Sequence, residues 1–294
     1  MKRRQFIQLL SLGTLSASLP PRLSAAGNKS QLVMGVFPRR NPKTTYEMFT
    51  PLTRLLSKQL GIPVQLQTTK DFGSFWKNVQ NQEYDLVHFN QYHYIVANRH
   101  YGYQAVAMLE ENNSSTIAGT ITVLKESGIT SVEQLRGRKV VFGGGKRAML
   151  SHILPRWLLK NNGLDASEYF SSFARNPPNA IFSIYNGQAD AAGFGDAVFK
   201  MPQVTSMLDT SKLHVLVKSD PIAQLPWAVS YQLGEELSDS IKSALTGIKQ
   251  TPEGLEALKK AGITDIIPAS HDDYLPSLEI IQEVFGESLG VDQP

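Results

Sequence analysis

Short apolar runs alternate with longer amphipathic stretches in the N-terminal half of the chain. Residues 32–37 form an apolar run typical of a buried strand, and a turn at residues 38–42 precedes a helical pattern over residues 44–60 that ends at Gly61. The same alternation predicts further strands and helices at residues 64–68, 72–80, 85–89, 91–101 and 105–109. Strands that alternate with helices of this length indicate a mostly parallel α/β sheet.

A long β-branched segment at residues 116–124 separates this unit from a second one. Its length and composition predict a strand that crosses between two lobes. Residues 226–231 are interpreted as the return crossing. Between the two crossings, the pattern predicts a short helix, a strand, two helices and a strand at residues 131–137, 139–142, 149–161, 179–187 and 213–217.

The predicted fold class is therefore α/β, with two α/β lobes joined by two crossing strands and a ligand cleft between them. Lobe 1 comprises residues 27–118 and 222–294, and lobe 2 comprises residues 119–221. The tail of lobe 1 has helical apolar spacing at residues 238–261 and 273–285.

The first 26 residues have the pattern of a secretory signal peptide. Lys2, Arg3 and Arg4 precede a mildly apolar stretch over residues 6–19, and the small residues that follow predict cleavage near Ala26. The paired arginines before Phe6 fit the twin-arginine export route, with the general secretory route as the alternative. Residues 1–26 are therefore set aside from the expected fold.

Removing this segment changes the charge balance of the chain. The segment carries four of the 29 Lys and Arg residues and none of the 26 Asp and Glu residues, so the remainder is one charge negative. Nucleic acid and anionic membrane are not expected partners, and any anion site must be local. The absence of cysteine excludes a thiol nucleophile, a thiolate metal site and a lipidated cysteine. Export without a lipid anchor predicts a periplasmic location.

Motifs for catalysis or metal binding are weak. The sequence has no Gly-x-Ser-x-Gly elbow, and the glycine-rich stretch at residues 140–149 differs from a nucleotide loop because Arg147, and not Ser or Thr, follows Lys146. His93 and His100 lie two helical turns apart, too far to share an ion directly. The sequence predicts no metal site and no cofactor. A periplasmic hydrolase or metal-dependent enzyme is the weaker alternative function.

Three predicted strand-to-helix junctions carry the polar residues of most interest, at residues 37–45, 88–94 and 140–149. Ligands of open α/β sheets collect beyond the carboxyl ends of the strands, where helix N-termini present free N–H groups and the positive end of the helix dipole. Three such junctions from two lobes, facing one cleft, suit a small anion. The alternative for each junction is an ordinary capped helix start.

Several blocks of the sequence resemble the periplasmic phosphate/phosphite/phosphonate-binding proteins of ABC importers. The similar blocks are residues 85–97, 131–141, 154–163 and 186–192, and the resemblance extends over residues 32–285. It implies a class II periplasmic binding protein that closes over its ligand and delivers it to the membrane subunits of an ABC permease. The protein is expected to be a monomer without a cofactor.

The ligand-binding positions of that family are matched unevenly. Tyr94 falls on the tyrosine of the family motif, whereas Asn90 and Gln91 replace its Gly-Pro pair. Residues 148–151, Ala-Met-Leu-Ser, stand where the family has a Ser-Thr-Ser-Gly run that holds the phosphonate. The hydroxyl groups are replaced by preceding glycines and two cations, which leaves the identity of the ligand open.

These considerations give a set of candidate ligand-binding residues. Arg39 is a candidate for a bidentate contact to an oxyanion, and Asp196 for a contact to a cationic ligand group, with a structural salt bridge as its alternative. Thr44 and Thr45 are candidates for hydroxyl donors or for helix capping. The full set is Arg39, Thr44, Thr45, Asn90, Gln91, Tyr92, Tyr94, Gly144, Gly145, Lys146, Arg147, Ala148, Asn179 and Asp196.

The sequence thus predicts an exported solute-binding protein of an ABC importer that captures a small oxyanion of the phosphonate, phosphite or phosphate type. The alternative keeps the same fold and makes the protein the periplasmic ligand sensor of a histidine kinase.

Overall fold

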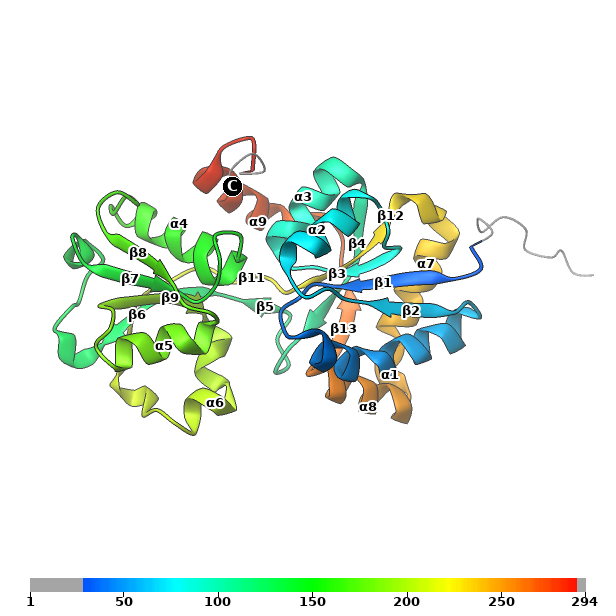
Figure 1. Ribbon diagram of the computed structural model, residues 1–294, viewed down its shortest axis with the longest axis horizontal. Coiled ribbons are helices and arrows are strands. Elements are labelled where there is room, and N and C mark those ends of the chain that lie inside the picture. The colour runs from blue at the N-terminus through cyan, green and yellow to red at the C-terminus, as the bar shows by residue number, and fades with distance from the viewer. Residues whose placement is uncertain (1–28, 290–294) are drawn as a thin grey trace, which may run out of the picture.

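The computed structural model describes residues 29–289, which fold into two lobes that each contain a β-sheet (Figure 1). The predicted signal peptide and its cleavage site lie outside these described residues. Within residues 29–289, no helix is both long enough and apolar enough to cross a membrane. The α/β architecture with two lobes predicted from the sequence is confirmed.

Lobe 1 is built on a six-stranded sheet of order β13-β4-β12-β3-β1-β2. Its strands are β1 (Leu32–Val36), β2 (Val64–Gln67), β3 (Leu86–His88), β4 (Tyr103–Glu110), β12 (Pro226–Ser230) and β13 (Asp265–Pro268). Its helices are α1 (Pro42–Leu60), α2 (Phe72–Gln80), α3 (Gln91–Tyr101), α7 (Gly234–Thr246), α8 (Pro252–Ala261) and α9 (Leu275–Phe285). The apolar runs of β1 and β3 are buried because helices cover both faces of the sheet (Figure 1).

Lobe 2 is built on a five-stranded sheet of order β10-β6-β9-β7-β8. Its strands are β6 (Gly119–Leu124), β7 (Lys139–Phe142), β8 (Phe170–Phe173), β9 (Ala191–Gly195) and β10 (Leu213–Lys218). Its helices are α4 (Leu154–Asn161), α5 (Pro177–Tyr185) and α6 (Pro202–Thr205), and one π-helical turn at Met149–Ile153 leads directly into α4. Separate apolar clusters lie around Leu159 and around Ile181.

The sheets are mixed, which corrects the expectation of mostly parallel strands. In lobe 1, β1 pairs in parallel with β2 and β3, whereas β12 is antiparallel to both β3 and β4. In lobe 2, β6 is antiparallel to β9 and β10. β6 is the first sheet strand after the chain enters lobe 2, and β12 is the first after it returns to lobe 1. Both therefore run away from the boundary between the lobes, and their antiparallel neighbours β3, β4, β9 and β10 run toward it. Apolar periodicity carries no information about strand direction.

A two-stranded sheet of β5 (Thr116–Ile117) and β11 (Ile222–Ala223) connects the lobes. The expected single crossing strand at residues 116–124 is divided at Ala118 into β5 and β6. The expected return crossing at residues 226–231 is wrong, because β12 occupies the interior of the lobe 1 sheet and Trp227 is fully buried there. The return crossing is β11, which is too short to give a pattern of its own.

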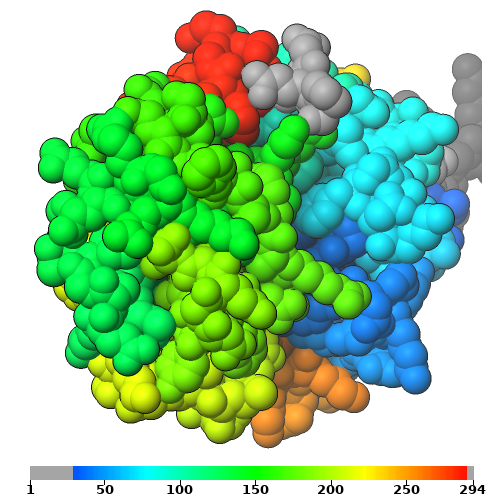
Figure 2. All heavy atoms as spheres, turned by 60° about the vertical axis from the view of Figure 1, so that its left-hand side comes forward, coloured from blue at the N-terminus to red at the C-terminus, as the bar shows by residue number. Residues whose placement is uncertain are grey.

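The C-terminal helix α9 lies over the boundary between the lobes (Figure 2, in red). Trp157 of α4 donates its indole N–H to Glu283 Oε2 at 2.7 Å, and Lys160 Nζ donates to the Glu283 carbonyl at 2.9 Å. Tyr92 of α3 donates to the Leu289 carbonyl at 2.9 Å. The segment after β13 therefore contacts both lobes beside the connecting strands.

Three buried histidines make the stability of the fold sensitive to acid. Burial lowers the pKa of His88 and His93 to about 3 and that of His152 to about 4. In the unfolded chain, their pKa is about 6.5, so the unfolded state takes up protons first as the pH falls below that value. The stability due to each neutral histidine is therefore present at pH 7 and decreases by about 1.4 kcal/mol per pH unit between about pH 6 and pH 4.

We expect the loss of unfolding free energy between pH 7 and pH 5 to be about 2 kcal/mol smaller in His152→Gln than in the wild type. Urea denaturation at the two pH values measures this difference. His214→Gln, at an exposed position on β10, is the matched control and should behave like the wild type. Equal pH-dependent losses in His152→Gln and His214→Gln would contradict the assignment.

Candidate functional site

The three junctions singled out in the sequence meet at a cleft between the lobes. The cleft has a volume of about 270 Å³. Lobe 1 contributes the loops after β1 and β3, and lobe 2 contributes the loop after β7, the end of β9 and the loop before α5. Its polar and glycine lining consists of Arg39, Asn90, Gln91, Glu111, Gly143, Gly144, Gly145, Ser151, Arg175, Asn176, Gly195 and Gln224.

At the first junction, Asn41 caps α1 in place of the threonines considered from the sequence. Asn41 Oδ1 accepts a hydrogen bond from the Thr44 N–H at 3.0 Å, and Thr45 Oγ1 donates to the Asn41 carbonyl at 3.2 Å. Thr45 is buried and lines a smaller pocket with His88 and Phe49. Neither threonine lines the main cleft, so both are placed as structural residues of the helix start.

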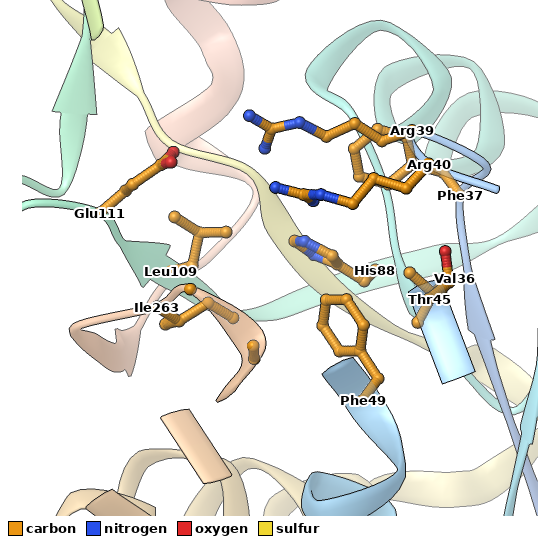
Figure 3. Close-up of a pocket in the computed structure, with 12 residues that line it drawn as sticks. Val36, Phe37, Arg39, Arg40, Thr45, Phe49, His88, Leu109, Glu111 and Ile263 are labelled. Carbon is orange, nitrogen blue, oxygen red and sulfur yellow. The ribbon is translucent and has the colours of Figure 1, made fainter. Parts of the chain in front are cut away.

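Arg39 and Arg40 extend from this junction toward the side of the pocket that holds Glu111 (Figure 3). Desolvation and the neighbouring Arg39 charge lower the pKa of Arg40, and Glu111 opposes that shift. Of the two arginines, only Arg39 also lines the main cleft. The exposed Arg39 guanidinium is thus placed to meet an anion, with Arg40 and Glu111 beside it.

At the second junction, Asn90 caps α3. Its Oδ1 atom accepts from the His93 N–H at 2.8 Å and lies 2.9 Å from His93 Nδ1, which fixes the proton of the neutral imidazole on Nδ1. Gln91 is fully buried, and its Nε2 donates to the carbonyl of Ala223 in the connecting strand β11 at 3.0 Å. Asn90 and Gln91 line the cleft, so both stay candidates for ligand binding.

Tyr92 and Tyr94 are placed in the interior of lobe 1. Tyr94 Oη accepts from the Ala105 N–H at 3.2 Å and lies 3.0 Å from His271 Nδ1. Both tyrosine rings are at most 2% exposed, and neither lines the pockets at the lobe boundary. Their placement does not support their choice as ligand-binding residues. Burial raises the pKa of Tyr92, partly opposed by the charge and hydrogen bond of Arg147 from lobe 2.

At the third junction, a tightly held loop leads from β7 into a helix without a side-chain cap. A Cβ atom on Gly143 would lie 2.5 Å from the Pro177 Cα, so close packing against the start of α5 requires glycine there. His152 Nδ1 donates to the Lys146 carbonyl at 2.8 Å, and the Ala148 N–H donates to the Gly145 carbonyl at 2.9 Å. Ala148 stands at the N-cap of the helical segment that begins at Met149.

Two further cleft residues, Arg175 and Asn176, were missed in the sequence. Asn176 caps α5, with its Oδ1 accepting from the Asn179 N–H at 3.0 Å. Asn179, the residue chosen from the sequence, is exposed and outside the cleft lining. An Asn followed by two prolines is a recognisable helix start, and this signal points to Asn176 as the residue at the junction.

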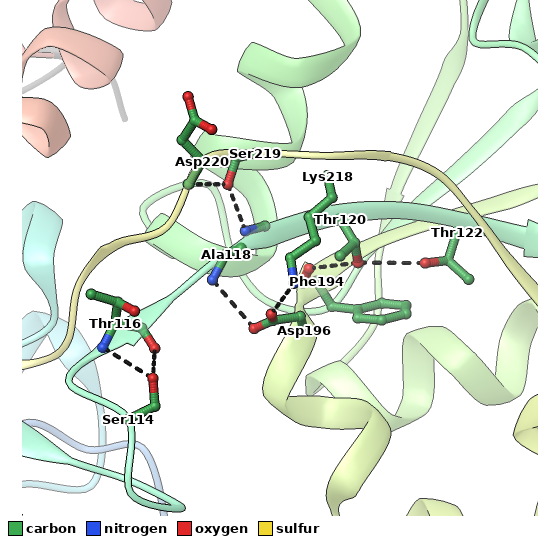
Figure 4. Close-up of polar contacts among 11 residues, drawn as sticks. Ser114, Thr116, Ala118, Thr120, Thr122, Phe194, Asp196, Lys218, Ser219 and Asp220 are labelled. Carbon is green, nitrogen blue, oxygen red and sulfur yellow. Dashed lines mark hydrogen bonds and ion pairs between the residues drawn. The ribbon is translucent and has the colours of Figure 1, made fainter.

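Asp196 stabilises the segments that connect the two lobes. Its Oδ1 accepts from the Ala118 N–H at 3.2 Å, and its Oδ2 pairs with Lys218 Nζ at 2.7 Å (Figure 4). Nearby, Ser219 Oγ accepts from the Gly119 N–H at 3.0 Å. Asp196 is absent from the cleft lining, so its position agrees with the structural salt bridge considered as the alternative.

Lys146 and Arg147 line a second pocket that adjoins the cleft. Phe72, Trp76 and His93 form the opposite wall from lobe 1. Lys146 and Arg147 thus face lobe 1 across the lobe boundary, but they do not line the main cleft. Within residues 29–289, no cluster of three His, Cys, Asp or Glu residues has the arrangement of a metal site. In the cleft lining, two arginines stand against one carboxylate, Glu111, and together with the backbone N–H groups and amides they suit the site to binding an anion.

Two lobes joined by a pair of short strands, with a cleft at the carboxyl ends of their sheet strands, define a class II periplasmic binding protein. The chain belongs to the family described as "ABC transporter, phosphonate, periplasmic substrate-binding protein", whose family model matches residues 34–274. The resemblance found in the sequence is therefore confirmed. Members of this family are periplasmic substrate-binding components of ABC transporters.

Individual relatives are distant but cover most of the chain. The phosphate-import protein PhnD of Mycolicibacterium smegmatis is 24% identical over 289 residues, covering 91% of this chain and 90% of that protein. PhnD1 of Prochlorococcus marinus, solved with methylphosphonate, has a TM-score of 0.73 at 17% identity and covers 87% of this chain and 99% of its own. XAC2383 of Xanthomonas citri, solved with ATP, has a TM-score of 0.75 at 16% identity, and the match covers 87% of this chain and 98% of XAC2383.

Proposed function

We propose that this protein captures a small phosphorus oxyanion in the cleft and delivers it to an ABC importer. The observation that carries the proposal is the helix start at Ala148, which has no side-chain cap and lines the same cleft as Arg39 and Arg175. An uncapped helix N-terminus presents free backbone N–H groups, and the helix dipole favours a negative charge there. Two guanidinium groups supply the charge that pairs with an oxyanion.

Three helix starts at or near the cleft differ from the start at Ala148. Asn41, Asn90 and Asn176 cap α1, α3 and α5 with their own side chains. Their first N–H groups are therefore partly satisfied without a ligand. Only the Ala148 start, among these four in the described part of the chain, has no side-chain cap. Gly195 and Met201 also line the cleft without a side-chain cap, but the helices that follow them have only five and four residues. In this proposal, the oxyanion takes the place of the missing cap, and the hydroxyl run of the family becomes unnecessary.

The roles of the other residues follow from their placement. Gly144 and Gly145 allow close approach to the loop backbone, and Asn90 and Asn176 border the ligand from opposite lobes. Lobe closure is proposed to occur about β5 and β11, with residues 27–118 and 222–294 rotating against residues 119–221. The partner of the closed form is the membrane permease, and the location is the periplasm after removal of the signal peptide. The similarity to a phosphate-import protein and to a protein solved with methylphosphonate supports this ligand class.

A thermal-shift panel tests the proposed ligand class. Inorganic phosphate, phosphite and methylphosphonate are compared with sulfate and acetate at one concentration and ionic strength. At a hundredfold excess over its Kd, a ligand stabilises the folded state by about 2.7 kcal/mol, which raises Tm by about 5 °C in a domain of this size. We expect such a shift from at least one phosphorus oxyanion and a smaller shift from acetate. Shifts with acetate alone, or with none of the five, would refute the proposal.

A further inference from the structure

An aromatic pocket opens beside the cleft on its lobe 1 side. The Phe72 and His93 rings are stacked, with 5.1 Å between their centroids and an interplanar angle of 21°. The centroid of the Trp76 ring lies 5.4 Å from that of His93. Phe72 is 38% exposed, so part of its ring is open to an occupant of the pocket. The pocket has a volume of about 380 Å³.

The aromatic pocket is continuous with the cleft. Phe72, Asn90, Gly145 and Ala148 line both spaces, so a ligand held at Ala148 has the aromatic wall as its neighbour. Gly145 faces this wall without a side chain, and a Cβ atom there would meet nothing within 4 Å. The glycine therefore does not serve packing, and it leaves the space between loop and rings open.

The pocket has more room than an inorganic oxyanion needs. Phosphate and methylphosphonate each have five non-hydrogen atoms, which together need about 150 Å³ when each is given the volume of a water molecule. The cleft, with a volume of about 270 Å³, is already large enough for either anion. The aromatic pocket offers partly exposed aromatic surface from Phe72 and Trp76, which is suited to contact with a planar group and excludes water from an apolar one.

The chemistry of the imidazole agrees with an apolar occupant. Burial lowers the pKa of His93 to about 3, and Asn90 holds the proton on Nδ1, so the ring that stacks on Phe72 is neutral at physiological pH. The neutral ring adds no charge of its own to the aromatic wall, and Lys146 and Arg147 supply the cationic side of the pocket from lobe 2.

We propose that the ligand is an organic phosphonate or phosphate ester whose planar substituent occupies the pocket formed by Phe72, Trp76 and His93. The phosphorus oxyanion lies at Ala148, and the substituent extends from it between the loop at Gly145 and the aromatic rings. This inference rests on the proposed function, and it adds that the protein selects for the substituent as well as for the oxyanion.

Calorimetric titration with methylphosphonate and phenylphosphonate tests the inference, because the two ligands share the oxyanion and differ in the ring. We expect the wild type to bind phenylphosphonate about tenfold more tightly. Trp76→Leu, which keeps apolar packing against Tyr101, should reduce this preference to less than threefold and leave methylphosphonate binding within twofold. Phe72→Ala, at a partly exposed position, provides a second variant if Trp76→Leu does not fold.

Phe170→Ala is the matched control, since Phe170 is 71% exposed on strand β8 and outside both pockets. Its affinity for each ligand should equal that of the wild type. Equal affinities of the wild type for the two ligands, or a preference that persists in both Trp76→Leu and Phe72→Ala, would overturn the inference and leave the proposed function standing. Failure of both ligands to bind the wild type would also overturn the inference, and the proposed function would fall with it only if inorganic phosphate and phosphite did not bind either.

Discussion

Replacing Arg39 with alanine should weaken the binding of methylphosphonate by about 10- to 100-fold. A hydrogen bond from a charged donor contributes about 1.5–3 kcal/mol, and the Arg39 guanidinium lies at the cleft on the lobe 1 side. Arg175→Ala should cause a loss of similar size from the lobe 2 side. Because both residues are exposed, neither replacement should lower the unfolding free energy by more than about 0.5 kcal/mol. Calorimetric titration and urea denaturation measure the two quantities.

Arg54→Ala separates this specific effect from a general change of charge. Arg54 is exposed on α1 of the same lobe and lines neither the cleft nor the aromatic pocket. Its replacement should leave the affinity within about twofold of the wild type. If Arg39→Ala and Arg175→Ala bind methylphosphonate as tightly as Arg54→Ala, the oxyanion does not occupy the position proposed here.

Replacing Ala148 with aspartate should raise stability and abolish binding. The backbone of Ala148 has φ −80° and ψ 106°, an extended conformation suited to an N-cap, and its side chain makes no capping bond. An aspartate there would bond to the free N–H groups of the helix and add about 1 kcal/mol to the unfolding free energy. The same carboxylate would occupy and repel the oxyanion, so the affinity for methylphosphonate should fall at least about 100-fold.

Ala148→Asn distinguishes the charge of the new cap from its hydrogen bonds. Asparagine caps a helix about as well as aspartate but carries no charge. The unfolding free energy of Ala148→Asn should rise by a similar amount. Its affinity for methylphosphonate should fall by less than that of Ala148→Asp. A stabilised Ala148→Asp variant with unchanged affinity would show that the ligand does not use this helix start.

Much of the fold follows from local chemistry that the sequence displays. The Asn41-Pro42 pair and Gly61 bound α1 as a cap, a first-turn proline and a left-handed C-terminal glycine. The apolar runs of β1, β3 and β7 are strands because helices bury both of their faces. The sequence could predict that the three junctions lie at one cleft, because the carboxyl ends of strands and the N-termini of helices lie at one edge of an α/β sheet.

Other features depend on the tertiary structure and have no local signal. Residues 91–97 of α3 are all buried, so the helix has no polar face that would indicate its orientation. The sequence therefore could not show that Tyr92 and Tyr94 point away from the cleft. β9, which was not predicted, has two glycines within five residues and is a strand through its pairing with β6 and β7. Arg175 reaches the cleft because Gly143 packs on Pro177, a contact between segments that are distant in sequence.

Calorimetric titration of the wild-type protein, freed of carried-over ligand, with methylphosphonate tests the central claim most directly. The account predicts one binding site per chain with a Kd below about 10 µM, and the loss of that heat in Ala148→Asp. Inorganic phosphate or phosphite should compete with methylphosphonate for the same site. An absence of binding heat for all three phosphorus oxyanions at millimolar concentration, in a protein that unfolds cooperatively, would contradict the account.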